Sequence, residues 1–459
     1  MFKPMILSSA VLMALLSTGV QAATAKNVIF FLGDGMGPTT VTATRLYKVG
    51  EAGQLTMETL DHTARIKTFS HDAQTTDSAP SMSAYMTGVK MNNEVISMSA
   101  DTVAESPVKD ANGNNGLSGC ASSNGQAVST LLELAKAKGK AVGAVTTTEL
   151  THATPAATYA HVCHRDAAYD IAAQAIPGGA GFNSALGDGV DVLMGGGANY
   201  WTPYDKDNNK RGRADGRDLM AELKAQGYAT ATTKSELAAV DPASSSRLIA
   251  LFSKTSHLDY DLDRQANSAS TQPSLSEMTS KAIDLLSKNQ DGYFLMVEGG
   301  RIDHALHGTN AKRALQDASA FDDAIKTALG KVDLKNTLIV VTADHDHTMT
   351  INGYSAKGNN VLDLVKEGSD KTIKRDINGN AITTLAFGNG PNRKQVREDL
   401  TSEQVMADSY LQESGVKLGS ETHGGGDVML FAKGINADLF KGTLDNTKVF
   451  DKVKTALGL

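Results

Sequence analysis

The chain has 459 residues, of which 41% are hydrophobic, 21% are charged and 5% are aromatic. This balance is typical of a globular protein with a large core, and it excludes a disordered chain, a collagen-like repeat and a small disulfide scaffold. The 44 basic and 51 acidic residues give a net charge of -7. Because no basic excess is available to bind phosphates of nucleic acid, we expect no nucleic-acid partner.

The N-terminus has the three parts of a secretory signal peptide. Lys3 is a basic start, residues 5–16 are an apolar stretch, and Val20-Gln21-Ala22 is a small-residue cleavage site. The apolar stretch is too short to span a bilayer, which disfavours the alternative of a membrane anchor. No later run has the length of a transmembrane helix, so we expect no membrane partner. We predict that residues 1–22 are removed and that the mature protein is periplasmic or secreted.

Strand-like apolar runs alternate with segments of helical periodicity along the rest of the chain, which predicts an α/β layered fold. Most runs are continuous, as expected for parallel strands that are buried on both faces of a sheet. Ser274 and Glu277 form a capping-box pattern at the start of one helix. In chain order, we predict strands at 27–32, 141–146, 191–194, 248–252, 293–297, 337–341 and 428–432, and helices at 128–137, 219–226, 274–286, 311–329 and 452–457.

Two stretches interrupt this alternation. Residues 99–123 are rich in Ser, Asn and Gly, which predicts a surface loop. Residues 354–420 are polar and weakly periodic, which indicates an insertion that projects from the main fold. We find no internal repeat and no proline-rich linker. The sequence therefore predicts one domain, residues 23–459, with an insertion at about 354–420.

Cys120 and Cys163 are the two cysteines of the chain. In an oxidising compartment an even number favours one disulfide. Two buried free thiols are the alternative, because the sequence gives no distance between the two side chains. Two cysteines are too few for a zinc site made of thiolates.

Acidic residues and histidines recur just after the predicted strands. Ligands of open α/β sheets bind outside the carboxyl ends of the strands, so we expect these side chains to gather there. Carboxylates that are brought together repel one another unless a cation compensates their charge. Asp, Glu and His are suitable ligands for zinc, whereas sets of oxygen ligands suit magnesium. The residues concerned are Asp34, Glu298, Asp303, His307, Asp344 and His345.

Each of these features has another interpretation when it is taken alone. The spacing of Asp303 and His307 places both on one face of a helical turn, which also fits a surface salt bridge. A capping aspartate with satisfied histidines also fits residues 344–347 (DHDH). Residues 33–37 (GDGMG) resemble a dinucleotide loop, but Pro38 stands where a third glycine or alanine is required.

Two further phosphate or acyl-transfer motifs are excluded. Residues 423–426 (HGGG) resemble an esterase oxyanion loop, but the chain contains no G-x-S-x-G sequence. It also contains no G-x-x-x-x-G-K-[ST] phosphate loop.

Ser78 is the candidate nucleophile, because its small neighbours Ala79 and Ser81 would let a substrate approach the hydroxyl. The alternative is a helix N-cap formed by Ser78 or Asp77. The two roles are compatible, since a helix N-terminus also favours an anionic substrate. His71 is the nearest histidine in the sequence, and nothing marks it as a base. A metal would then lower the pKa of the hydroxyl.

Taken together, these motifs resemble those of the alkaline phosphatases over nearly all of the mature chain. Six motifs occur in the order of that family, which makes the resemblance very specific. They are GDGMG (33–37), TDSA (76–79), HATPAA (152–157) with Arg165 eleven residues after Thr154, VEGGRIDHALH (297–307), TADHDH (342–347) and THGGGD (422–427).

The resemblance implies a three-layer α/β/α sandwich around a large, mostly parallel sheet. It implies an exported homodimer that hydrolyses small phosphate monoesters through a phosphoserine on Ser78, with Arg165 as the clamp for the phosphate. It also implies two zinc ions (Zn2+) and one magnesium ion (Mg2+). The implied ligands are Asp303, His307 and His423 for the first zinc, Asp34, Asp344, His345 and the oxygen of Ser78 for the second, and Asp34, Thr154 and Glu298 for the magnesium.

Two histidines differ from one bacterial branch of the family, which has Asp and Lys at these positions. His152 and His304 look more like the branch that includes the animal enzymes. We expect His152 near the third metal as a candidate ligand, and His304 near the substrate or phosphate. His347 is expected beside the zinc ions without binding them. These replacements leave the identity of the third metal open.

Three other functions are rivals to that of a phosphomonoesterase. A sulfatase would carry C/S-x-P-x-R at its nucleophile, but Met82 replaces the required arginine. A phosphodiesterase of the same superfamily is a closer rival, although Arg165 favours the dianion of a monoester. The third is a non-catalytic metal- or phosphate-binding protein, and the intact Ser78, Thr154 and Arg165 argue against it.

Overall fold

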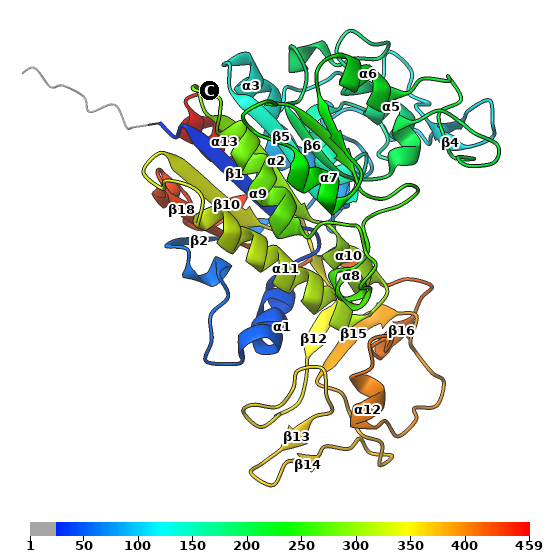
Figure 1. Cartoon of the computed structure of the whole chain (residues 1–459). Helices are drawn as coiled ribbons and strands as arrows, with labels where there is room; N and C mark the ends of the chain where they lie inside the picture. Colours follow the sequence, from blue (N-terminus) through cyan, green and yellow to red (C-terminus); the bar gives the residue numbers. More distant parts are fainter. Residues whose placement is uncertain (1–23) are drawn as a thin grey trace, which may run out of the picture.

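The computed structural model describes residues 24–459. The predicted signal peptide, residues 1–22, lies outside them, so that prediction is not tested. A ten-stranded sheet runs through the molecule, and helices pack against it (Figure 1). The predicted α/β fold with a large, mostly parallel central sheet is confirmed. No helix within the described residues is long and apolar enough to cross a membrane.

The strand order of the sheet is β19-β2-β18-β10-β1-β9-β5-β6-β8-β7. Among these strands, only β18 runs antiparallel to its neighbours, β10 and β2. The strands are β1 (Asn27–Gly33), β2 (His62–Lys67), β5 (Ala141–Glu149), β6 (Val192–Gly196), β7 (Ala229–Ala231), β8 (Leu248–Leu251), β9 (Tyr293–Gly299), β10 (Thr337–Thr342), β18 (Val428–Gly434) and β19 (Gly442–Asp445).

The register of the central strands determines where the chain leaves the sheet. In β1, Leu32 lies opposite Thr342 of β10 on one side and Glu298 of β9 on the other. The three parallel strands therefore end at the same edge of the sheet. As a result, the residues that follow them emerge close together, as expected at the carboxyl edge of an open α/β sheet.

Helices cover both faces of this sheet. On one face α9 and α11 pack on β1, β5, β6 and β9, and α1 packs on α11. On the other face α3, α4 and α13 contact β1, β5 and β9, with α2 packed against α4 and α13. The helices are α1 (Pro38–Val49), α2 (Ser78–Thr87), α3 (Leu131–Ala137), α4 (Ala153–Tyr159), α9 (Leu275–Leu286), α11 (Ala311–Leu329) and α13 (Asn446–Leu457).

All of the predicted strands are present, and three strands of the sheet were missed. In β2, buried and exposed residues alternate at its end, so this strand has no continuous apolar run. The missed β7 and β19 have three and four residues. The helix predicted from residue 128 begins at Leu131, because Thr130 is its N-cap in a capping box with Glu133. The helix predicted from residue 452 begins earlier, at Asn446, where Asp445 caps it.

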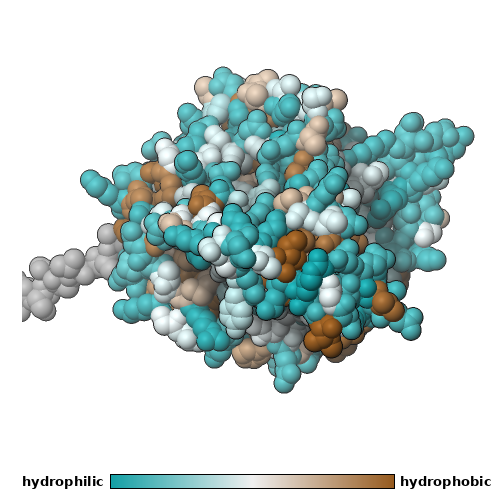
Figure 2. Space-filling view, turned by 90° about the horizontal axis from the view of Figure 1, so that it is seen from below, coloured by the Kyte–Doolittle hydropathy of each residue, from teal (hydrophilic) through white to brown (hydrophobic). Residues whose placement is uncertain are grey.

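The segment between Met349 and Lys417 builds a separate small sheet. Strands β12 (Met349–Ile351), β15 (Leu385–Gly390) and β16 (Ser414–Lys417) pair with one another and not with the main sheet. The segment projects at the lower end of the molecule in Figure 1. The view from below in Figure 2 shows a mostly hydrophilic surface with separate apolar patches. Exposed apolar residues of this part of the chain are Ile351, Tyr354, Ile377, Val396, Leu411, Val416 and Leu418.

The predicted loop at 99–123 is irregular apart from two short strands, β3 (Val108–Lys109) and β4 (Asn115–Leu117). Cys120, near its end, is disulfide-bonded to Cys163, with 5.9 Å between the Cα atoms. The predicted disulfide is therefore confirmed, and the alternative of free thiols was wrong. The bond ties the loop to the segment that leads into Arg165.

Candidate active site

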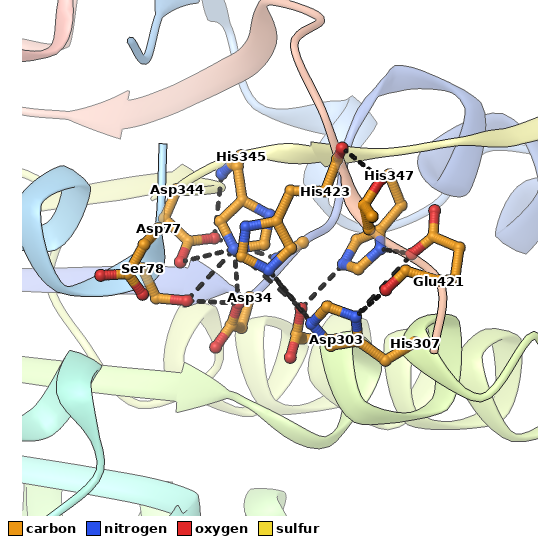
Figure 3. Close-up of polar contacts among 12 residues, drawn as sticks. Asp34, Asp77, Ser78, Asp303, His307, Asp344, His345, His347, Glu421 and His423 are labelled. Atoms are coloured by element: carbon orange, nitrogen blue, oxygen red, sulfur yellow. Dashed lines mark hydrogen bonds and ion pairs between the residues drawn. The ribbon is translucent and has the colours of Figure 1, made fainter. Parts of the chain in front are cut away.

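Side chains from several strand ends meet at the carboxyl edge of the sheet (Figure 3). Asp34 follows β1, whereas Asp344 and His345 follow β10. Asp303 and His307 lie on the short helix α10 (Arg301–His307), which follows β9. The three aspartates and His345 are buried. The structure thus brings together residues that are up to about three hundred positions apart in the sequence.

Asp34, Asp344 and His345 form one compact group of possible metal ligands. The Nε2 atom of His345 lies 3.3 Å from Oδ1 of Asp34 and 3.4 Å from Oδ2 of Asp344. The Nδ1 atom of the same ring is 3.2 Å from the carbonyl oxygen of Asp346, so Nδ1 carries the proton and the Nε2 lone pair faces the carboxylates. Oδ2 of Asp34 and Oδ2 of Asp344 are buried without a hydrogen-bond partner. A cation fits this set of acceptors.

Ser78 borders this group. Its Oγ atom lies 3.2 Å from Nε2 of His345 and 3.5 Å from Oδ1 of Asp34. Ser78 is the first residue of α2, and Asp77 precedes it as the N-cap residue, but no side chain caps the helix. The side-chain N-cap alternative was therefore wrong. The hydroxyl is aimed at the ligand group, and the carboxylate of Asp77 has other partners.

A second group is built from Asp303, His307 and His423. The Nδ1 atom of His307 is 2.5 Å from the carbonyl oxygen of Glu421, and that of His423 is 2.8 Å from the carbonyl oxygen of Thr76. Both Nδ1 atoms therefore donate, and the two Nε2 lone pairs face each other at 3.1 Å. Oδ1 of Asp303 lies 3.3 Å and 3.5 Å from these Nε2 atoms. A metal ion fits between them.

His347 lies against this second group without a free lone pair. Its Nε2 atom is 2.7 Å from Oδ1 of Asp303, and its Nδ1 atom is 2.5 Å from Oε2 of Glu421. Burial would lower the pKa of His347, but hydrogen bonds to the carboxylates of Asp303 and Glu421 raise it to about 10. The ring then donates from both nitrogens. One of its nitrogens also lies within 4.8 Å of ligand atoms of Asp303, His307 and His423, so the expectation that His347 does not bind metal stays a prediction.

Asp34, Glu298 and His152 form a third group whose ligand atoms lie within 4.8 Å of one another. Oε2 of Glu298 accepts hydrogen bonds from the hydroxyls of Thr146 and Thr148. Oε1 of Glu298 and the Oγ1 atom of Thr154 are buried, and the hydroxyl of Thr154 lies against the carboxylate of Glu298. No third group among the described residues satisfies either atom, so both are available to a cation. The predicted ligands of the third metal are therefore neighbours in the structure.

Arg165 is held in place by its neighbours. One guanidinium nitrogen pairs with the carboxylate of Asp77, and the other lies 3.0 Å from Nε2 of His152. The second carboxylate oxygen of Asp77 accepts a hydrogen bond from the backbone of Glu94, at 2.7 Å. The carbonyl of Glu94 in turn accepts from the backbone N–H of Arg165, at 2.7 Å. These contacts fix the guanidinium at Asp77, the residue before Ser78.

Comparisons with known proteins decide the family. A family model described as alkaline phosphatase matches residues 25–459. This chain belongs to the alkaline phosphatase family. The tissue-nonspecific alkaline phosphatase of Rattus norvegicus is 38% identical over 454 residues, which cover 91% of this chain and 81% of the relative.

Two solved structures are also similar. The crystal structure of Thermus thermophilus alkaline phosphatase has a TM-score of 0.70 and 26% identity, and the match covers 95% of this chain and 92% of the other. A mutant of TAB5 alkaline phosphatase, in which a histidine is replaced with aspartate, has a TM-score of 0.67 and 25% identity, with 95% and 99% covered. Its title describes magnesium bound in a site named M3. As an alkaline phosphatase, the present chain is a metal-dependent phosphoric monoester hydrolase.

The buried carboxylates of this alkaline phosphatase site differ in how readily they ionise, since burial would raise the pKa of Asp303 but the charges and hydrogen bonds of neighbouring histidines hold it well below its usual range. Burial and the charges of Asp344 and Asp303 raise the pKa of Asp34 well above its usual range. Burial raises the pKa of Glu298 to about 7. Burial also lowers the pKa of His345 well below its usual range, so its ring is neutral. A neutral histidine beside carboxylates is the ligand state that divalent metals require.

Glycines 35 and 37 of the GDGMG motif make room for this site. Gly35 has a φ of +66°, a conformation that favours glycine, and a Cβ atom there would collide with the ring of His347. A Cβ atom on Gly37 would collide with the carboxylate of Asp346. The two glycines therefore let the chain after β1 pass close to the loop after β10, which carries Asp344 and His345. A dinucleotide-binding loop would not require this close approach.

Two residues of the site were missed by the sequence analysis. His257 stacks with His304, with 4.2 Å between ring centroids, and its Nδ1 atom accepts the N–H of Glu149 at 3.0 Å. No motif surrounds His257, so no sequence signal marked it. Glu421 stands two residues before His423, at the edge of the THGGGD motif, and this proximity was the one available signal. The predicted substrate residue His304 has its Nδ1 atom 3.1 Å from Arg301.

Proposed function

We propose that this alkaline phosphatase uses Ser78 as its nucleophile and Arg165 as the clamp for the transferred phosphoryl group. The observation that carries the proposal is the position of the Ser78 hydroxyl. It lies within 3.5 Å of two possible metal ligands, His345 and Asp34, at the start of a helix. A helix N-terminus favours the negative charge of a phosphate.

The three ligand groups fit two zinc ions and one magnesium ion. Asp303, His307 and His423 would hold the first zinc. The proposal rests on the converging Nε2 lone pairs of His307 and His423, which no proton donor satisfies. When bound, such ions supply charge stabilisation for the attacking and leaving oxygens and lower the pKa of a bound hydroxyl. The second zinc would be held by Asp34, Asp344, His345 and the oxygen of Ser78, and the magnesium by Asp34, Glu298 and Thr154, with His152 beside it.

The chain's own residues position the phosphate and the nucleophile. In the first step, Oγ of Ser78 forms a bond to phosphorus as the bond to the leaving oxygen breaks, and the proton that Oγ gives up is balanced by the proton that the leaving alcohol takes. Water then attacks the phosphoserine, which releases phosphate and restores the hydroxyl. The guanidinium of Arg165 matches two non-bridging oxygens of the phosphoryl group. Phosphoryl transfer depends mainly on such positioning and charge stabilisation.

The contact between His152 and Arg165 competes with binding of a metal ion by His152. Its Nε2 atom accepts from the guanidinium, whereas its Nδ1 atom is buried without a partner. We propose that His152 supports the third site by orienting Arg165 and that His304 lies along the substrate. The TAB5 mutant with aspartate in place of a histidine and magnesium in the M3 site supports a link between such a histidine and the third metal.

We further propose that the mature protein is an exported homodimer. Its disulfide suits an oxidising compartment. The exposed apolar residues of the segment 349–417 offer a surface for a second copy. The size of the purified protein, measured by light scattering, would be that of two chains, and the N-terminal sequence of the exported protein would begin at Ala23.

The test of the proposed function is hydrolysis of p-nitrophenyl phosphate at alkaline pH. The purified protein is assayed before chelation, after chelation, and after zinc and magnesium are added back. We expect activity to be lost and then restored by zinc, with a further increase from magnesium. Loss that zinc does not restore would contradict the zinc assignment. A diester or a sulfate ester that is turned over faster than the monoester would favour the rival enzymes.

A further inference from the structure

Glu421 has no place in the ligand sets above, yet it lies at the centre of the contacts behind them (Figure 3). It belongs to the segment just before β17 (His423–Gly424), and its side chain is fully buried. A buried carboxylate is costly unless several donors satisfy it. The contacts of Glu421 therefore indicate what the residue does.

The carboxylate of Glu421 accepts hydrogen bonds from two residues that follow β10. Its Oε2 atom accepts from Nδ1 of His347 at 2.5 Å. Its Oε1 atom accepts from the backbone N–H of Thr348 at 2.7 Å and from the hydroxyl of Thr348 at 2.5 Å. The opposite nitrogen of His347 then contacts Oδ1 of Asp303 at 2.7 Å. A continuous chain of hydrogen bonds leads from Glu421 to Asp303.

The backbone of Glu421 holds a second ligand. Its carbonyl oxygen accepts from Nδ1 of His307 at 2.5 Å, and its N–H donates to the carbonyl of His307 at 2.9 Å. The first contact assigns the proton of His307 to Nδ1 and leaves Nε2 for the metal. Hydrogen bonds of this kind orient ligands and raise their basicity. One residue thus acts on two of the three ligands of the proposed first zinc.

We propose that Glu421 is the positioning residue of the first zinc site, where it fixes Asp303 through His347 and fixes His307 through its own backbone. The inference rests on the proposed function, because it assumes the zinc ligands named there. It adds a residue on which the affinity for zinc depends, although this residue contacts neither metal nor substrate.

A glutamine at this position cannot make the same contacts. Its carbonyl oxygen can accept from Thr348, and its amide can donate to Nδ1 of His347 only when the single proton of that ring lies on Nε2. Glu421→Gln therefore keeps the size of the side chain but replaces the hydrogen bonds of a charged carboxylate with weaker neutral ones. The backbone contacts with His307 remain, so the change isolates the carboxylate.

The chain offers a matched control in Glu133. This second buried glutamate also pairs with a histidine, since its Oε1 atom lies 2.7 Å from Nε2 of His161. It lies in the first turn of α3 and belongs to none of the three ligand groups. Glu133→Gln measures the cost of removing a buried carboxylate from a histidine where no metal ligand is involved.

The experiment titrates zinc against a competing chelator into the metal-depleted full chain and its two variants, with thermal unfolding as a second readout. We expect Glu421→Gln to lower the affinity of one zinc by about 10- to 100-fold, a typical effect of losing a contact behind a metal ligand. Glu133→Gln should bind zinc like the unaltered chain. At saturating zinc, Glu421→Gln should regain much of its kcat with an unchanged KM for p-nitrophenyl phosphate.

Two outcomes would overturn the inference. One is a zinc affinity of Glu421→Gln within twofold of that of the unaltered chain. The other is an equal loss of zinc affinity in both variants, which would indicate a general effect of instability. If Glu421→Gln does not fold, Thr348→Val, which removes one hydrogen bond to the same carboxylate, takes its place, with a smaller expected loss of affinity. Failure of the unaltered chain to bind zinc would instead contradict the proposed function.

Discussion

The main sheet and the projecting segment at 349–417 are built in different ways. The central strands β1, β9 and β10 are continuous apolar runs covered by helices on both faces. The projecting segment has short strands and a small cluster of its own, made of Leu364, Ala381 and Val405, whereas its Met349, Leu385 and Phe387 belong to the main core. Most of the proposed metal ligands follow long buried strands, whereas the outer part of the segment has only this small cluster beneath it. We therefore expect the two regions to differ in stability and in their tolerance of change.

The site nevertheless needs the chain on both sides of that segment. His347 precedes it and His423 follows it, and the two residues pair across β11 (Asp346–His347) and β17. The segment thus leaves and re-enters the main fold at the first metal group. The pairing at the site therefore holds the two ends of the projecting segment together.

Of the expected effects on activity, the largest should follow removal of the proposed nucleophile, which lies beside the main sheet. Ser78→Ala removes the hydroxyl that forms the phosphoserine, so we expect turnover to fall by on the order of 10^4-fold or more. The three metals should remain bound, as measured by elemental analysis. Ser319→Ala is the control, because it removes a hydroxyl of the same size within α11. This variant should retain activity. Unchanged turnover in Ser78→Ala would remove Ser78 from the mechanism.

A smaller loss is expected when the phosphate clamp is altered. Arg165→Lys keeps the charge but loses the paired donors and the planar contact with Asp77. We expect kcat/KM for p-nitrophenyl phosphate to fall by about 10- to 100-fold, which corresponds to roughly 1.5–3 kcal/mol for a hydrogen bond to a charged group. Arg217→Lys, which alters an arginine paired with Glu222 away from the site, is the control. An equal effect of both changes would contradict the clamp.

Matched core substitutions compare the stability of the two regions directly. Val340 is buried in β10 and Val405 is buried in the small cluster of the projecting segment. Val340→Ala should lower the free energy of unfolding by about 2–3 kcal/mol. Val405→Ala should instead speed amide hydrogen exchange within 349–417 and leave the main unfolding transition and the activity nearly unchanged. A single cooperative transition that both substitutions destabilise alike would mean that the two regions unfold as one unit.

The smallest expected effect is a pH dependence at the buried pair of His161 and Glu133. Burial lowers the pKa of His161, but the hydrogen bond and charge of Glu133 outweigh this and raise it above 6.5. Burial raises the pKa of Glu133, and the contact with His161 outweighs this and holds it below 4.5. The contribution of His161 to the free energy of unfolding is fully present below pH 6.5 and is lost as the pH rises through the pKa of His161 in the folded chain. The contribution of Glu133 is fully present above pH 4.5 and is lost as the pH falls through the pKa of Glu133 in the folded chain.

The pair should therefore contribute most between about pH 4.5 and 6.5. We expect His161→Gln to reduce the free energy of unfolding in this window by about 1–2 kcal/mol. Urea unfolding at several pH values measures the difference. A difference that is constant from pH 5 to pH 9 would contradict the ion pair.

Most of the main sheet could be predicted because its buried strands are runs of apolar residues, as in residues 337–341 (TLIVV). The strand β2 (HTARIK) could not, because only one of its faces is buried. The helix α2 (SAPSMSAYMT) consists largely of small residues that are buried on every side, so it shows no apolar period. Its packing depends on α4 and α13, which are distant in the sequence.

The candidate ligands could be predicted because they occur in motifs at strand ends. The supporting residues could not, because each is a single side chain whose partner lies far along the chain. Glu421 reaches His347 across 74 positions, and His257 reaches Glu149 across 108. Only the folded chain brings these pairs together.

The central claim is that Ser78 becomes phosphorylated during turnover. The most direct measurement is a rapid acid quench of the zinc- and magnesium-loaded protein during hydrolysis, followed by mass spectrometry of its peptides. We predict one phosphorylated peptide that contains Ser78, and its absence from Ser78→Ala. A phosphate on another residue, or continued turnover with no phosphorylated residue under conditions that trap one, would contradict the account.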